Sequence, residues 1–205
     1  MGLSSRPSKY IGDAGVAKFL ETYKSHTPFY IARMRVLGAL ASPHKDLLPV
    51  MVISSFWAEG EFPKFVTKDE ANQFFSTFMG LWRRMEKMAQ AQNNLLSACP
   101  SLSTHKEAIS HLEKRILELE AGFIEGFWGG VDDLPMPSAS AALIDALGDE
   151  AVAYQTLLED VKSWSDYNDT IRTALRNELL ERDTTLEDTF KALLILKHKN
   201  TQTSH

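Results

Sequence analysis

The chain has 205 residues, of which 44% are hydrophobic and 24% are charged, as in an ordinary globular protein that can bury a core. Its single cysteine, Cys99, excludes a disulfide framework and a cysteine-based zinc site within one chain. With a net charge of −5, no run of eighteen apolar residues and no apolar leader at the first residues, we expect a cytoplasmic protein without a membrane span.

The first elements are helices punctuated by proline. We expect a short helix over 14–25, with its apolar residues on one side. Thr27 followed by Pro28 is a helix start signal, and Pro43 stops the helix that follows. This second helix is therefore expected to run through Ser42.

The next segment, 46–58, is almost wholly apolar. We interpret it as a short buried helix that begins near Pro49, because the chain has no second strand pattern with which it could pair. Thr67 and Glu70 then form a T-x-x-E capping box, which predicts a long helix from 68 to about 97.

The longest helical pattern covers residues 104–130 and is expected to be the central helix. Pro135 and Pro137 follow it and indicate a linker. A helix over 138–147 is expected to end at Gly148.

Asp149 is expected to cap the next helix, and the pattern from there to about Glu181 fits one long helix or two helices broken near 163–166. Thr184 and Glu187 form another T-x-x-E pattern, which predicts the start of the last helix.

These elements predict an all-α protein, a multihelical bundle of roughly seven to nine helices packed around the helix at about 104–130. We expect a single domain over 1–205. The alternative division is into two lobes, at about 13–98 and 104–198.

The central helix has clear signals at both ends. Thr104 and Glu107 form a capping box, and Gly129 with Gly130 allows the chain to leave the helix with positive φ. Apolar residues recur at steps of three and four along two rows, so more than one side of the helix is expected to be covered. The first row consists of Ile109, Leu112, Ile116, Leu119, Phe123 and Phe127.

Glu113 and Glu120 are seven residues apart and project between the two apolar rows. One interpretation is a pair of half-buried carboxylates that face basic residues such as Arg33 or Arg35. The other is that the rows splay and both glutamates reach water, which agrees with the rarity of unpaired buried carboxylates.

Gly122 and Gly126 lie on one face of the same helix, although each glycine costs about 1 kcal/mol relative to alanine in a helix interior. Close approach of another backbone would offset this cost. We therefore expect a tight helix crossing at Gly122 and Gly126.

Four aromatic residues are dense for a turn region: Phe56, Trp57, Phe62 and Phe65. Core filling is one interpretation. The other is a surface that binds a partner, because aromatic side chains anchor protein interfaces.

The sequence lacks a phosphate-binding loop, a nucleophile elbow and a metalloprotease motif. Glu107 and His111 share a helix face, but no second pair completes a metal site, and we expect His44, His105 and His111 at the surface. Asp132 and Asp133 could hold a hard cation weakly, but they lack the EF-hand spacing, so a solvated acidic turn is the preferred interpretation. We expect no catalytic residue, cofactor or bound metal.

Several short segments resemble the YgfB/YecA-like family of bacterial proteins. In the first half these are Leu37 to Pro43, Leu48-Pro49, Lys68 to Phe75 and Leu81-Trp82, and in the second half Ala121 to Phe127. The resemblance covers about residues 15–180 and implies an all-helical fold, a bacterial cytosolic protein and no transferable active site. Longer members of the family end in a Cys/His metal-binding module, which this chain lacks.

The charge of the chain is uneven, at +4 over residues 1–100 and −9 over residues 101–205. The acidic second half makes nucleic acid an improbable partner and favours attraction between the two halves or to a basic partner. We predict a non-catalytic interaction or regulatory module that binds another protein, with self-association as an open option. The alternative is a small-ligand binder or an enzyme that uses Glu113 and Glu120.

Overall fold

The computed structural model describes residues 10–93, 95–131 and 134–202, and these residues form helices and connecting segments without any strand. The all-α prediction is therefore confirmed. In chain order the helices are α1 (Asp13–Thr22), α2 (Phe29–Ala41), α3 (Pro49–Ser54), η1 (Ala58–Gly60), α4 (Lys68–Ala91), α5 (His105–Leu117), η2 (Glu118–Ile124), α6 (Glu125–Trp128), α7 (Ser138–Ser163) and α8 (Asp169–Gln202).

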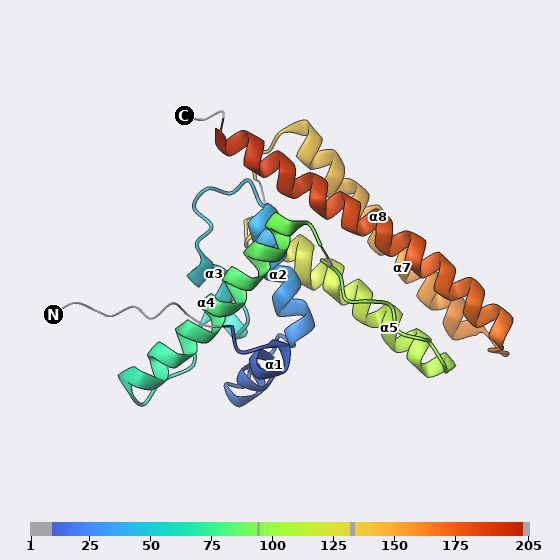
Figure 1. The fold of residues 1–205 in the computed structure, drawn as a ribbon, viewed down its shortest axis with the longest axis horizontal. Coiled ribbons are helices and arrows are strands. Elements are labelled where there is room, and N and C mark those ends of the chain that lie inside the picture. Colours follow the sequence, from blue (N-terminus) through green and yellow to red (C-terminus); the bar gives the residue numbers. More distant parts are fainter. Residues whose placement is uncertain (1–9, 94, 132–133, 203–205) are drawn as a thin grey trace.

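Helices α7 and α8 form a long antiparallel pair, and α5 runs beside them (Figure 1). Helix α2 packs against η2 and α6 on one side and against α1, α3 and α4 on the other. The buried apolar side chains make one cluster that extends from Val16 to Leu194, across both of the lobes considered above. Within the described part of the chain, no helix has the length and apolar character that a membrane span requires.

The expected central helix is present as three consecutive segments, α5, η2 and α6. The capping box of Thr104 and Glu107 is formed, and Gly129 ends the helix with a φ of 61°. The middle segment, η2, is a π-helix, which the residue pattern did not indicate. Such wide turns often occur where another group takes a backbone carbonyl out of the regular ladder.

The tight crossing expected at Gly122 and Gly126 is confirmed, and α2 is the helix that crosses there. A Cβ atom on Gly126 would lie 2.1 Å from the backbone oxygen of Arg35, and one on Gly122 would lie 2.7 Å from Cβ of Met34. Helix α2 contributes a glycine of its own, because a Cβ on Gly38 would lie 2.0 Å from the backbone oxygen of Phe123. Glycines on both helices thus allow the two backbones to touch.

Three expected helix boundaries are wrong, and one of them is the end of α4, which lies at Ala91 instead of near residue 97. Gly148 lies inside α7 instead of ending a helix, and a Cβ atom at this position would meet nothing within 4 Å. Thr184 lies inside α8, where its hydroxyl donates to the carbonyl of Leu180 at 2.8 Å instead of capping a helix. The break in the second half falls after Ser163, and the Asn168 side chain accepts from two backbone N–H groups in the first turn of α8.

Candidate functional site

A cluster of charged side chains lies in the interior between α5, η2, α7 and α8. The Arg115 side chain is fully buried, and its two terminal nitrogens bind the carboxylates of Glu118 and Asp183, the second at 2.8 Å. The Tyr154 hydroxyl donates to the other oxygen of Asp183 at 2.7 Å. Because the Glu118 side chain is only 1% exposed, loss of Arg115 would leave a buried carboxylate without its partner.

The pKa values in this cluster indicate a structural role. Burial alone lowers the pKa of Arg115, but the carboxylates of Glu118 and Asp183 outweigh burial and raise that pKa above its ordinary value. Burial, followed by the charge and hydrogen bond of Asp183, raises the pKa of Tyr154. Neither Arg115 nor Tyr154 can therefore exchange a proton near neutral pH, as general acid–base catalysis requires.

Arg115 and Arg33 hold the segment that follows α4 against the core. Arg115 donates to the carbonyl of Ser97, and Arg33 donates to the Ser97 hydroxyl and to the carbonyl of Leu95, all at 2.8 Å. These hydrogen bonds fix residues 95–97, which are not helical, after α4 ends at Ala91.

An open groove of about 600 Å³ lies between this segment and α8. Both of its carboxylates already have protein partners: Glu187 accepts from the N–H of Leu96 and pairs with Lys191, and Asp183 binds Arg115. Burial, then the nearby Asp183 carboxylate, raises the pKa of Cys99 and keeps it a thiol. The groove therefore offers few unsatisfied groups to a ligand.

His111 lies in the interior, so its expected place at the surface is wrong. His111 lies on the same helix face as Arg115, one turn earlier, and only 8% of the residue is exposed. Burial, with smaller contributions from Arg115 and Lys114, lowers the pKa of His111 to about 4.

We expect His111 to make stability pH-dependent. The unfolded chain takes up a proton near pH 6.5 and the folded chain only near pH 4, so stability is complete above about pH 6.5 and falls as the pH drops through this window. The contribution is at most about 3 kcal/mol, at 1.36 kcal/mol per pKa unit. In urea unfolding at pH 7, 6, 5 and 4.5, His111→Phe should lose less stability on acidification than wild type. His198→Gln, at an exposed position, is the control, and equal pH slopes for wild type and His111→Phe would contradict the assignment.

Glu113 and Glu120 are exposed, so the interpretation of a half-buried pair is wrong. Glu120 accepts from the Gln155 amide at 2.7 Å, and Glu113 lies 3.9 Å from Lys162. Both partners are on α7, and the expected facing arginines are elsewhere. The buried carboxylate of this helix is Glu118.

Of the four aromatic residues in the turn region, Phe56 and Trp57 are buried and Phe62 and Phe65 are half-buried. Trp57, Phe62 and Phe65 pack against Phe74 in tilted or edge-to-face arrangements, with ring centroids 4.9 to 5.9 Å apart. The Trp57 indole N–H donates to the carbonyl of Tyr23 at 2.8 Å. These contacts match core filling, and the four rings do not form an open apolar surface.

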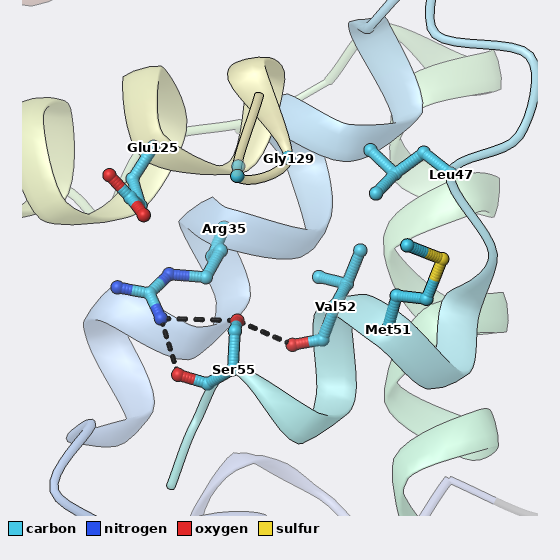
Figure 2. A pocket seen from close by; sticks show the side chains of 9 residues that line it. Arg35, Leu47, Met51, Val52, Ser55, Glu125 and Gly129 are labelled. Atoms are coloured by element: carbon cyan, nitrogen blue, oxygen red, sulfur yellow. Dashed lines mark hydrogen bonds between the residues drawn. The ribbon is translucent and has the colours of Figure 1, made fainter. Parts of the chain in front are cut away.

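A small cavity lies where α2, α3 and α6 meet (Figure 2). It measures about 80 Å³. Figure 2 shows Glu125 and Gly129 on one side, aliphatic side chains on another, and Arg35 reaching toward Ser55. The lining residues are Arg35, Leu47, Met51, Val52, Ser55, Glu125, Gly126, Gly129 and Gly130.

Arg35 organises the polar end of this cavity. Its Nε and Nη2 donate to the carbonyl of Ala121 in the π-helix at 3.1 and 2.8 Å, and Nη1 donates to the carbonyl of Ser55 at 2.7 Å. Burial lowers the pKa of Arg35, and the charge of Glu125 partly opposes that shift. Arg35 thereby links α2, α3 and η2, and the π-helical turn supplies the carbonyl that it binds.

Three exposed aliphatic side chains lie at the start of α3, next to the cavity. Leu48, Val50 and Met51 are 55%, 42% and 46% exposed, and Met51 also lines the cavity. They lie at the start of α3, where Pro49 is the first residue of the helix. We call Leu48, Val50 and Met51 the α3 rim.

No group of three or more His, Cys, Asp or Glu residues is placed to hold a metal ion within the described ranges. Glu107 belongs to the capping box of α5, and His111 is buried and is not paired with Glu107. Asp132 and Asp133 lie outside the described residues.

Arg115, Glu118 and the α3 rim were not expected as site residues from the sequence. Arg115 carries a usable signal, because it stands three residues after Leu112 and four before Leu119, on the apolar row itself. A cation at such a spacing indicates a buried ion pair. The α3 rim has no comparable signal, since exposed and buried residues alternate within one apolar run.

A scan against protein-family models, and searches among curated proteins and solved structures, returned no match to this chain.

Proposed function

We propose that this protein is a non-catalytic binding module, and that another protein docks on the α3 rim and the cavity beside it. The observation that carries the proposal is the exposed Met51 side chain, which lines a partly enclosed cavity and is adjacent in the chain to the exposed Leu48 and Val50. Exposed apolar residues scattered singly are normal, but a group around a concavity is typical of a protein interaction site.

The rigid surroundings support this proposal. The cavity wall is built by the glycine crossing of α2 with α6 and by the hydrogen bonds of Arg35, so its shape is already formed before a partner arrives. A preformed site lowers the entropy that binding costs. The Arg115 cluster is buried, and the groove over it is lined by charged side chains such as Glu187 and Lys191, with Leu180 as its exposed aliphatic side chain.

We expect Met51→Glu to abolish partner binding without unfolding the protein, because it places a charge in the rim while the side chain is half in solvent. Affinity capture from a lysate of the source cells, followed by quantitative mass spectrometry, should show a protein that wild type retains and Met51→Glu loses by at least about tenfold, in line with the 1–2 kcal/mol of an anchor residue.

The matched control is Val66→Glu, since Val66 is an aliphatic residue that is 91% exposed and does not line the cavity. Val66→Glu should retain the same protein as wild type. If Met51→Glu and Val66→Glu capture the same proteins in the same amounts, the α3 rim is not the binding surface. Retention of a second copy of this chain alone would replace a foreign partner by self-association.

We also infer kinship with the YgfB/YecA-like family and, with it, a bacterial cytoplasmic setting. The spatial relation of two of the resembling segments supports this inference: Leu37 to Pro43 and Ala121 to Phe127 carry Gly38, Gly122 and Gly126. The two segments meet at the crossing of α2 with η2 and α6.

A further inference from the structure

The protein partner has a definite chemistry. Resting on the proposed function, we infer that the cavity beside α3 binds an aliphatic side chain of a partner segment. The residue next to that side chain is lysine or arginine, and its positive charge pairs with Glu125. The cavity volume, the bonding of Arg35 and the negative charge at the mouth each support part of this assignment.

The volume selects the side chain that enters. A cavity of about 150 Å³ holds the six carbons of benzene, so about 80 Å³ holds about three or four carbons. That is the branched end of valine, leucine or isoleucine, and it is too small for an aromatic ring. The apolar wall of Leu47, Met51 and Val52 matches such a group.

Arg35 is not free to bind an anion. Its three nitrogens already donate to the carbonyl of Ala121 and to the carbonyl and hydroxyl of Ser55. These bonds use four of the five N–H groups of the guanidinium, so a carboxylate or phosphate could form a two-point contact only by replacing one of them. The cationic group in the wall is therefore structural.

Glu125 places a carboxylate at the mouth of the cavity, where its charge also acts on Arg35. Glu125 is exposed, and no hydrogen bond or ion pair joins its carboxylate to another described residue. Gly129 and Gly130, which also line the cavity, stand at the C-terminal end of the helix formed by α5, η2 and α6. The last turn of a helix carries partial negative charge, so it adds to the carboxylate in favouring a cation.

Open space at Gly130 leaves room for this cation, because a Cβ atom there would meet nothing within 4 Å. The partner's aliphatic side chain enters between Met51 and Gly129, and the adjacent basic side chain extends over Glu125. The acidic second half of this chain attracts the same kind of partner at longer range.

A random heptapeptide library displayed on phage, selected on the full-length protein, tests the inference. Peptides enriched on wild type should contain valine, leucine or isoleucine next to lysine or arginine. Selection on Glu125→Gln should keep the aliphatic preference and lose the basic one. A synthetic peptide from the wild-type selection should bind Glu125→Gln about fivefold more weakly in fluorescence anisotropy, as expected for a solvent-exposed ion pair, and this difference should shrink in 0.5 M salt.

The outcomes separate the inference from the proposed function. If wild type and Glu125→Gln enrich the same peptides, or if the enriched peptides lack a basic residue while Met51→Glu still abolishes their binding, the inference is wrong and the proposed function stands. If no peptide is enriched, or if Met51→Glu binds the selected peptides as wild type does, both fail. Thermal unfolding of each variant confirms that the compared proteins are folded.

Discussion

Replacing Arg115 by methionine is expected to lower the free energy of unfolding by about 3–5 kcal/mol, the usual cost of removing one partner from a buried ion pair. Methionine fills much of the space, so the loss comes mainly from the carboxylates of Glu118 and Asp183, which lose the cation they share, and Glu118 keeps only the 3.8 Å contact with Lys114. Segment 95–97 also loses one of its three arginine hydrogen bonds. Urea unfolding at pH 7 measures the change.

Two comparisons make this result specific. Arg172→Met removes an exposed pair with Asp169, 3.0 Å apart, and should cost less than about 1 kcal/mol. The double variant Arg115→Met with Glu118→Gln should recover part of the loss, because the buried carboxylate is then gone. An Arg115→Met protein no less stable than Arg172→Met would refute the structural role of the cluster.

The pH dependence of Arg115→Met follows from the same argument. A buried carboxyl group without a cation has a raised pKa and becomes neutral on mild acidification. The stability difference between wild type and Arg115→Met should therefore be largest near pH 7 and shrink toward pH 5. A difference that stays constant over this range would assign the loss to packing instead of to buried charge.

Local signals in the sequence predicted most of the helices. The capping box at Thr104, the proline near the start of α3 and the glycine at residue 129 act within one or two turns, so their effect can be deduced without tertiary contacts. The boundaries expected at Gly148 and Thr184 failed because both residues have a second use. Glycine is tolerated inside a packed helix, and threonine can donate to its own helix backbone.

The interior charges and the candidate binding site were harder to predict, because they depend on contacts between distant residues. The spacing of Glu113 and Glu120 suggested that they were buried, but the buried carboxylate is that of Glu118. Its partner Arg115 also binds Asp183 from α8. The π-helical segment moves the residues after position 118 out of α-helical phase. That change lies after Glu118, so it does not decide which glutamate faces the interior; the tertiary contacts of Glu118 with Arg115, and of Arg115 with Asp183, do.

Gly38→Ala is expected to be as disruptive as Arg115→Met, for a different reason. A Cβ atom at residue 38 would lie 2.0 Å from the backbone oxygen of Phe123 and 2.8 Å from the backbone nitrogen of Phe127. Both are backbone atoms in the core, so the helices themselves must separate. We expect a loss of about 3 kcal/mol or more in urea unfolding, at the upper end of the range for overpacking.

Gly148→Ala is the matched control, because it makes the same change inside helix α7, where a Cβ meets nothing within 4 Å. It should stabilise the protein by up to about 1 kcal/mol through helix propensity alone. Gly126→Ala should behave like Gly38→Ala, since its Cβ would lie 2.1 Å from the backbone oxygen of Arg35. Once one alanine has separated the helices, the second meets less resistance, so the double variant should lose less than the sum of the single losses. Additive losses would mean that the two glycines serve separate contacts and that α2 does not cross η2 and α6 as one rigid joint.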